Sequence, residues 1–151
     1  MIEISESYKV HIVILTWNNN KILKRCLESI ENVDHKNFTI SVIDNNSSDD
    51  SLKMIAENFP NVQTIKNSKN FKFGRGYNEG LKKINVEDND FIILLNDDTI
   101  VSRNFIDELI NPLAKDQKAI ISTPKILYSS NINKIWYAGG VVDLWLSLIH
   151  I

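Results

Sequence analysis

The sequence predicts an α/β protein with an open, mostly parallel sheet and helices on both faces. Short runs rich in β-branched residues alternate along the chain with longer segments in which apolar residues recur at helical spacing. Repeats of this length join parallel strands through right-handed crossovers, which place helices against both sides of the sheet. The expected architecture is therefore Rossmann-like.

The first half of the chain supplies the clearest elements. Val10–Thr16 (VHIVILT) is apolar and β-branched, as is typical of a buried strand. Asn18 to Asn20 then offer caps for a helix with one apolar face. The further elements expected in this half are that helix at 21–31, a strand at 38–43, a helix at 50–58, a strand at 62–65 and, after a glycine-rich stretch, a helix running through Leu81 and Ile84.

The second half begins clearly and then loses its pattern. The apolar run FIILL predicts a fourth strand at 90–95, buried on both faces. A helix at 104–114 and a fifth strand at 119–122 follow, and only short strand-like pieces remain at 125–128 and 135–137. Because no linker or internal repeat intervenes, we expect a single domain over residues 1–151, incomplete at its C-terminal end.

Composition excludes several classes of protein. The formal net charge of −2, from 17 basic and 19 acidic residues, gives no general polyanion surface, so nucleic acid is not an expected partner. Cys26 is the only cysteine, which favours a reducing compartment and a packing role. The N-terminus lacks a secretory signal, and no apolar run approaches the ~20 residues of a transmembrane helix. We therefore expect a cytoplasmic protein with no transmembrane segment, compatible with peripheral contact at the inner membrane face.

The segment Asn96-Asp97-Asp98-Thr99 follows the fourth strand directly. Open α/β sheets bind ligands at the carboxyl ends of their strands, and two adjacent carboxylates there could hold a divalent cation such as Mg²⁺ or Mn²⁺. The alternative is that these residues only turn the chain and cap the next helix.

Asp44 ends the second strand in the same way. Its carboxylate could accept hydrogen bonds from a nucleobase or from ribose hydroxyls. The alternative is a turn, because residues 45–49 are rich in turn formers and Asp49 could cap the next helix.

Three of the five glycines, Gly74, Gly76 and Gly80, lie within seven residues. Small residues allow a ligand to approach the backbone closely, and Arg75 could contact phosphate oxygens. The alternative is a flexible loop and a helix start. Neither a Walker A motif nor the dinucleotide-binding fingerprint is present, since residues 16–20 (TWNNN) contain no glycine. His11 is expected to be a core residue.

The chain resembles family 2 glycosyltransferases of the A-type nucleotide-sugar-binding fold over about residues 10–140. Four segments carry the resemblance in order: VHIVILTWNNNKILKRCLESI, SVIDNNSSDDS, NFKFGRGYNEGL and FIILLNDDT. The third is similar to a rhamnosyltransferase-like branch. The resemblance implies that Asp98 is the principal metal ligand and that the nucleotide-sugar is bound by Thr16, Asn18, Asp44, Asn46, Gly74, Gly76, Asn78, Asn96 and Asp97.

The chain departs from the family pattern at several places. Asn96 replaces the first acid of the metal-binding triplet, and Lys72 and Arg75 stand where related sequences often have small residues. The catalytic general base is unknown and is expected beyond the C-terminus. Residues 146–151 (LSLIHI) match a translated sequencing adapter, so we expect a foreign tail on a truncated fragment; the alternative is a genuine terminal strand.

The expected function is transfer of a sugar from a nucleoside-diphosphate sugar to an acceptor hydroxyl, with inversion and with help from Mg²⁺ or Mn²⁺. The resemblance implies a glycan or lipid-linked glycan acceptor and a role in cell-surface polysaccharide synthesis. Two alternatives remain open: a non-catalytic nucleotide-sugar-binding module and a sugar-1-phosphate nucleotidylyltransferase.

Overall fold

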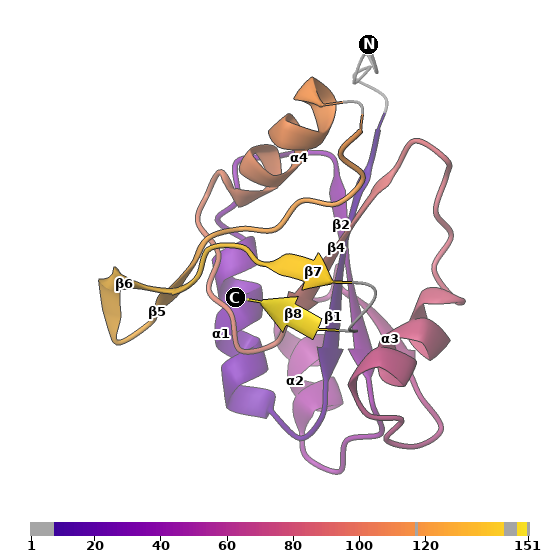
Figure 1. Ribbon diagram of the computed structural model, residues 1–151. Helices are drawn as coiled ribbons and strands as arrows, with labels where there is room; N and C mark the ends of the chain where they lie inside the picture. Colours follow the sequence, from indigo (N-terminus) through magenta and orange to yellow (C-terminus); the bar gives the residue numbers. More distant parts are fainter. Residues whose placement is uncertain (1–7, 117, 144–147, 151) are drawn as a thin grey trace. The chain divides into compact units, whose positions relative to one another are not determined.

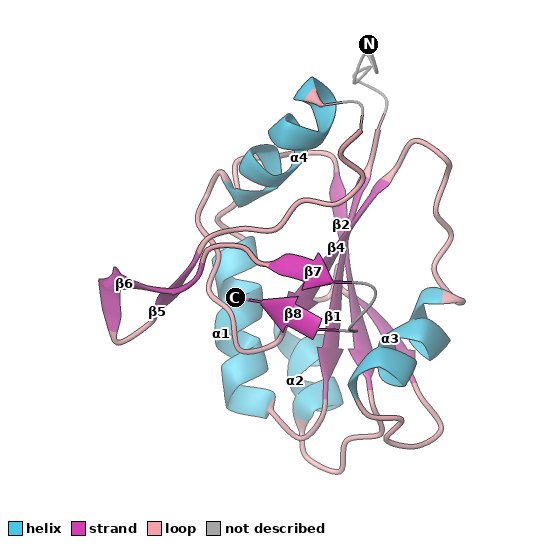
Figure 2. Cartoon of the chain, in the orientation of Figure 1, coloured by secondary structure: helices cyan, strands magenta, loops and turns pink. Residues whose placement is uncertain are grey.

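The computed structural model describes residues 8–116, 118–143 and 148–150. It divides into two compact units, one within Ile4–Ile106 and the other within Asp107–Ile151. Figure 1 follows the chain by colour, and Figure 2 separates helices from strands. Among the described residues, no helix combines the length and the apolar character needed to span a membrane.

The first unit is built on a parallel four-stranded sheet with strand order β3-β2-β1-β4. Its strands are β1 (Val10–Thr16), β2 (Phe38–Asp44), β3 (Gln63–Lys66) and β4 (Phe91–Asn96), and its helices are α1 (Asn20–Ile30), α2 (Ser51–Asn58) and α3 (Phe73–Leu81). This confirms the predicted parallel α/β architecture, with boundaries within one or two residues for most of these elements.

Helices cover both faces of this sheet, as predicted. Figure 1 shows α1 and α2 along one side and α3 on the other. On the α3 side, Tyr77 packs with Val13, Ile43 and Ile65 in one buried cluster. Side chains alternate along a strand, so Ile12, the neighbour of Val13 in β1, faces the opposite side of the sheet, where α1 and α2 lie. Ile12 is fully buried.

Strand β4 differs from the prediction of burial on both faces. It is an edge strand of the sheet, and its residues alternate between partly buried and exposed, with Ile92 at 44% and Leu94 at 55% exposure. The apolar run therefore marks the strand correctly, but only one of its faces is covered.

Two further local predictions are wrong. The glycine-rich stretch is not a loop before a helix, since Gly74, Gly76 and Gly80 all lie inside α3. The expected caps at residues 18–20 also fail, because Asn19 makes no side-chain capping bond to α1. Instead, Asp49 of the next loop accepts a hydrogen bond from Asn20 N at 3.1 Å.

The second unit contains most of α4 (Phe105–Lys115) and two small antiparallel pairs. The first pair is β5 (Ile126–Tyr128) with β6 (Asn131–Tyr137), near the two short pieces predicted there. The second is β7 (Val141–Asp143) with β8 (Leu148–His150). Residues 146, 147 and 151 lie outside the described residues. The foreign origin expected for residues 146–151 therefore stays a prediction.

The strand predicted at residues 119–122 does not form. Ile120 and Ile121 are 86% and 81% exposed and belong to no sheet. A strand needs a neighbouring edge for its backbone hydrogen bonds, and these residues pair with none in the described part of the chain.

Candidate active site at the carboxyl edge of the sheet

The predicted site residues meet where the parallel strands end. In the sheet register Thr16 pairs with Asp44, and Leu15 pairs with Asn96. The backbone hydrogen bonds between β1 and β2 continue one residue beyond the end of β2, where Asn45 N donates to Thr16 O at 2.9 Å. The turns after β1, β2 and β4 therefore lie side by side, at the edge where open α/β sheets bind ligands.

A pocket of about 280 Å³ opens at this edge. Four of the predicted site residues line it together: Thr16, Asn96, Asp97 and Asp98. The other lining residues are Leu15, Trp17, Asn19, Asn45 and Phe73. The structure thus brings the ends of β1 and β4 and the start of α3 around one cavity.

The two adjacent carboxylates of the pocket have different surroundings. Asp97 Oδ2 accepts a 2.7 Å hydrogen bond from Thr16 Oγ1, which ties the end of β4 to the end of β1. Asp98 is exposed, and within the described residues its carboxylate has no protein hydrogen bond. Asp97 is therefore held in place, whereas Asp98 is free to accept a ligand.

The donor set suits a cation that is shared with a phosphate ligand. No group of three or more His, Cys, Asp or Glu side chains that could hold a metal occurs among the described residues. Mg²⁺ in phosphate-processing sites commonly uses one or two carboxylates, with waters and substrate phosphates as its other ligands. Asp98, with Asp97 beside it, fits that pattern.

The acidic segment also turns the chain, as its alternative interpretation expected. Thr99 Oγ1 donates to Asn96 O at 2.7 Å and closes the turn. It caps no helix, however, because α4 begins only at Phe105. Cys26 lies beneath the turn, with its Sγ 3.7 Å from Asn96 O, and burial raises the pKa of its thiol to about 11. This confirms a packing role for Cys26.

Asn45 organises the pocket and was not singled out from the sequence. Its Nδ2 donates to Asn70 Oδ1 at 2.9 Å and to Lys72 O at 3.1 Å. Its Oδ1 accepts from Asn67 Nδ2 and from Phe71 N, both at 3.1 Å. One buried amide thus fixes the loop before α3 against the end of β2. In the sequence Asn45 resembles any turn former, and no local signal distinguishes it.

Asp44 is fully buried and does not line this pocket. Its two carboxylate oxygens accept from Ser47 N at 3.1 and 3.3 Å, which is the turn-forming role considered as the alternative. Asp49 Oδ1 accepts from Ser51 N at 3.1 Å at the start of α2, but the N-cap position is Asp50, which makes no side-chain capping bond. Contact between Asp44 and a nucleoside stays a prediction.

The remaining predicted residues do not line this pocket. Asn18, at φ 51°, accepts from Ser48 N at 2.7 Å and joins the loops after β1 and β2. Asn78 is exposed on α3. Gly74 has no atom within 4 Å of the place where a Cβ would stand, so packing does not require a glycine there.

Two of the glycines serve close packing of α3 on the sheet. A Cβ on Gly76 would lie 3.1 Å from Asn45 Nδ2 and from Leu15 Cδ1. A Cβ on Gly80 would overlap the side chain of Ile43. Tyr77, between them, donates to Leu95 O at 2.8 Å, and burial raises the pKa of its hydroxyl to about 12. The glycine motif therefore seats α3 tightly beside the pocket.

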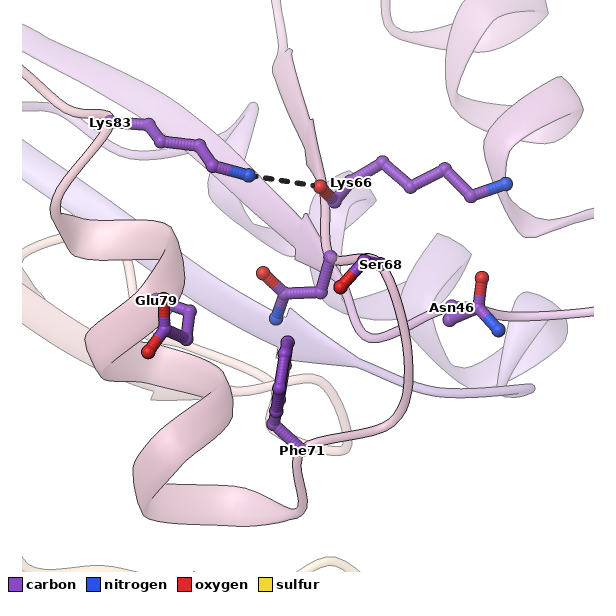
Figure 3. A pocket seen from close by; sticks show the side chains of 7 residues that line it. Asn46, Lys66, Ser68, Phe71, Glu79 and Lys83 are labelled. Atoms are coloured by element: carbon purple, nitrogen blue, oxygen red, sulfur yellow. Dashed lines mark hydrogen bonds between the residues drawn. The ribbon is translucent and has the colours of Figure 1, made fainter.

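A second pocket, of about 380 Å³, lies between the end of β3 and α3 (Figure 3). It is lined by Asn46, Lys66, Asn67, Ser68, Phe71, Glu79 and Lys83. In Figure 3 the ammonium of Lys83 donates to Lys66 O at 3.0 Å. Asn67 is 1% exposed, and its Oδ1 is a buried acceptor with no hydrogen-bond partner in the described structure. Of the predicted site residues, only Asn46 lines this pocket.

His11 lies at the opposite end of the sheet and takes no part in either pocket. Its Nε2 is 3.0 Å from Asp90 Oδ2, and its Nδ1 is 3.1 Å from Thr39 Oγ1. This confirms His11 as a core residue with satisfied ring nitrogens. The hydrogen bond from His11 holds the pKa of Asp90 below its ordinary value.

The chain is similar to two curated glycosyltransferases. It is 27% identical to a dolichyl N-acetyl-α-D-glucosaminyl phosphate 3-β-D-2,3-diacetamido-2,3-dideoxy-β-D-glucuronosyltransferase of Methanococcus voltae, over 85% of this chain and 48% of the relative. It is 25% identical to a GalNAc(5)-diNAcBac-PP-undecaprenol β-1,3-glucosyltransferase of Campylobacter jejuni, over 88% of this chain and 43% of the relative. The chain therefore spans about half the length of these relatives.

Solved structures share the fold. TarS of S. aureus in complex with UDP-GlcNAc superposes with a TM-score of 0.62 at 20% identity, over 72% of this chain and 32% of TarS. The mannosyltransferase PcManGT of Pyrobaculum calidifontis, in complex with GDP-Man and Mn²⁺, gives 0.63 at 18% identity, over 72% and 33%. The fold is thus the A-type glycosyltransferase fold. The family description "Glycosyl transferase family 2" matches residues 11–149, nearly the whole sequence, and the chain belongs to that family.

Proposed function

We propose that this chain carries the donor site of an inverting glycosyltransferase, which moves a sugar from a nucleoside-diphosphate sugar to an acceptor hydroxyl. The observation that carries the proposal is the pairing of a fixed Asp97 with a free Asp98 at the carboxyl edge of the sheet. A purely structural turn needs no unpaired carboxylate in a pocket. A site for a cation and a diphosphate does.

Asp98, with Asp97 beside it, would hold Mg²⁺ or Mn²⁺. When bound, such an ion would neutralise the negative charge that develops on the departing diphosphate. The chain's own residues orient the donor: the bond from Thr16 to Asp97 fixes the carboxylate, and Asn45 fixes the loop before α3. The acceptor hydroxyl attacks the anomeric carbon from the face opposite the diphosphate and gives its proton to a general base, whose identity is unknown, while the bond to the diphosphate oxygen breaks with inversion.

The second pocket supplies a place for the nucleobase. A base that stacks on Phe71 could donate one N–H to Asn67 Oδ1, the buried acceptor that has no partner in the described structure. The side-chain amide of Asn67 cannot flip without losing two hydrogen bonds, because its Nδ2 donates to Asn45 Oδ1 and to Gly76 O. Asp44 at the end of β2 and Asn46 on the loop after it would then lie toward the ribose.

The names of the two relatives support a proposal for the acceptor class. One is named for a dolichyl phosphate-linked sugar and the other for an undecaprenyl diphosphate-linked glycan. We infer a lipid-linked glycan acceptor for the whole protein, a role in cell-surface polysaccharide synthesis, and work at the cytoplasmic face of a membrane.

Calorimetric titration with UDP and with dTDP, each with and without Mn²⁺, tests the donor site. We expect binding that depends on Mn²⁺ and is weakened at least about 10-fold in Asp98→Ala, since a charge-assisted ligand is lost. Asp88→Ala, which removes another exposed carboxylate, from the loop before β4, is the matched control and should bind like the parent. Equal loss in both variants, or no binding by the folded parent, would contradict the proposal.

The nucleobase assignment has its own test. Phe71→Leu should weaken UDP binding about 10-fold, within the ~1–3 kcal/mol typical of stacking a base on an aromatic ring. Binding of inorganic pyrophosphate with Mn²⁺ should not change in the same variant, because pyrophosphate has no base. If both ligands weaken alike, Phe71 supports the fold and does not contact the base.

A further inference from the structure

One buried hydroxyl connects the two strands that end at the candidate site. Tyr77 of α3 is 4% exposed, and its hydroxyl donates to Leu95 O of β4 at 2.8 Å and accepts from Leu15 N of β1 at 3.3 Å. In the sheet register, Leu15 pairs with Asn96, the residue that follows Leu95. The hydroxyl therefore joins β1 to β4 one residue before the polar end of each strand.

Two glycines let α3 lie close to the sheet on either side of Tyr77. A Cβ on Gly76 would lie 3.1 Å from the side chain of Leu15, and a Cβ on Gly80 would overlap that of Ile43. This close approach brings the Tyr77 hydroxyl within hydrogen-bonding distance of the backbone of β1 and β4. Burial raises the pKa of the hydroxyl to about 12, so it keeps its proton and can donate at neutral pH.

Three contacts of Tyr77 involve residues in or next to the pocket. Leu15 lines the pocket, and Leu95 lies two residues before Asp97. The Tyr77 ring packs edge-on against Phe73, another lining residue, with ring centroids 5.2 Å apart. One partner would be enough to satisfy a buried tyrosine hydroxyl, but this hydroxyl uses its donor and its acceptor on two different strands.

We propose that Tyr77 is a positioning residue for the donor site: its hydroxyl sets the spacing of β1 and β4 and thereby places Thr16 to hold Asp97. The inference rests on the proposed function, in which Asp97 and Asp98 bind a cation together with the donor diphosphate. The hydrogen bond from Thr16 to Asp97, at 2.7 Å, joins the same two strands just beyond the Tyr77 hydroxyl. Because hydrogen bonds weaken as their geometry departs from the optimum, a change in strand spacing would release Asp97.

Hydrogen exchange of the ligand-free chain tests the positioning. Tyr77→Phe removes the hydroxyl and keeps the ring, so the packing against Phe73 remains. Backbone amides of residues 15, 16 and 95–97 should exchange about 3–10-fold faster, which corresponds to the loss of one buried hydrogen bond. Ile12→Val is the matched control, since it removes one methyl group from a fully buried residue on the other face of the sheet. It should not accelerate exchange selectively at these amides, whereas uniform acceleration or none in Tyr77→Phe overturns the proposal.

Titration with UDP and Mn²⁺ tests the link to the donor site through a double-mutant cycle. Tyr77→Phe and Thr16→Val should each weaken Mn²⁺-dependent binding about 3–10-fold. The double variant should bind no more weakly than the weaker single variant, because both changes act through Asp97, and additive losses would overturn the proposal. Ile12→Val should bind like the parent, and a thermal melt shows that each variant is folded. A folded parent that does not bind would refute the donor site itself, while the exchange rates still decide whether Tyr77 sets the strand spacing.

Discussion

Lys72 holds a backbone conformation that only glycine adopts without strain, and its replacement by glycine should stabilise the protein. The residue precedes α3 with φ 67° and ψ −165°. The surrounding hydrogen bonds impose this conformation: Lys72 N donates to Asn70 Oδ1 at 2.8 Å, and Lys72 O accepts from Asn45 Nδ2 and from Gly76 N, both at 3.1 Å. The same bonds build the pocket wall, so the strain persists in the native state.

The size of the effect follows from two opposing terms. A non-glycine residue in this region costs about 1–3 kcal/mol. Glycine removes that cost but gives the unfolded chain more freedom, worth about 0.5–1 kcal/mol. Lys72→Gly should therefore raise the free energy of unfolding by about 1 kcal/mol, which corresponds to a rise of about 2–4 °C in Tm for a chain of this length.

Urea unfolding of three variants isolates the backbone term. Lys72→Ala keeps the strain and removes the long side chain, whose ammonium has no partner in the described structure, so it should change stability by less than about 0.5 kcal/mol. Lys69→Gly makes the same exchange at a residue without positive φ, but it also removes the contact of the Lys69 ammonium with the Phe71 ring, so it should destabilise by at least about 0.5–1 kcal/mol. If Lys72→Gly is no more stable than Lys72→Ala, the strain argument is wrong.

Two further predictions concern stability. Gly80→Ala should destabilise the protein by about 1–3 kcal/mol, because the new Cβ would overlap the side chain of the fully buried Ile43. Gly74→Ala in the same helix has open space around the new Cβ and should stabilise the protein by up to about 1 kcal/mol. Urea unfolding midpoints that shift in the same direction for both variants would contradict this. The hydrogen bond with His11 lowers the pKa of the Asp90 carboxyl in the folded state. It therefore stabilises the fold fully at pH values above the ordinary Asp pKa of about 3.9. This stabilisation is lost as the pH falls through the lower pKa of the folded state. Asp90→Asn should therefore lower Tm at neutral pH and flatten the fall of Tm below about pH 4, and an unchanged Tm-against-pH curve would show that the pair contributes nothing.

The local pattern was sufficient for the first unit of the fold. VHIVILT is β-branched and apolar, and β1 has the bounds that this run predicts. The helix after it was predicted from one apolar stripe, and Leu23, Leu27 and Ile30 of that stripe are fully buried. Periodicity of this kind depends only on neighbours in the chain, so a sequence can reveal it.

The candidate site was predicted in outline for the same reason. Polar residues that interrupt an apolar strand mark its carboxyl end, and parallel strands bring their carboxyl ends to one edge. That argument placed Asp97, Asp98 and Asp44 at one edge, and the resemblance added Thr16; the pocket contains Thr16, Asp97 and Asp98 but not Asp44. The sequence could not show that Thr16 binds Asp97 and leaves Asp98 free, because that choice depends on a contact between residues 81 positions apart.

The features that depend on a partner far along the chain could not be read from the local sequence. FIILL predicts a strand, but the apolar run does not reveal that the face of β4 carrying Ile92 and Leu94 is exposed. Ile120 and Ile121 have strand propensity and no neighbouring edge to pair with. Asn45 resembles a turn former in the sequence, and only the structure shows that its side-chain amide makes four hydrogen bonds to residues 67–72. Local pattern and resemblance in the amino-acid sequence indicated most elements of the first unit, the family and the edge of the sheet that carries the candidate site. Long-range contacts determined which faces are covered and which carboxylate is free, since local propensity carries no information about them.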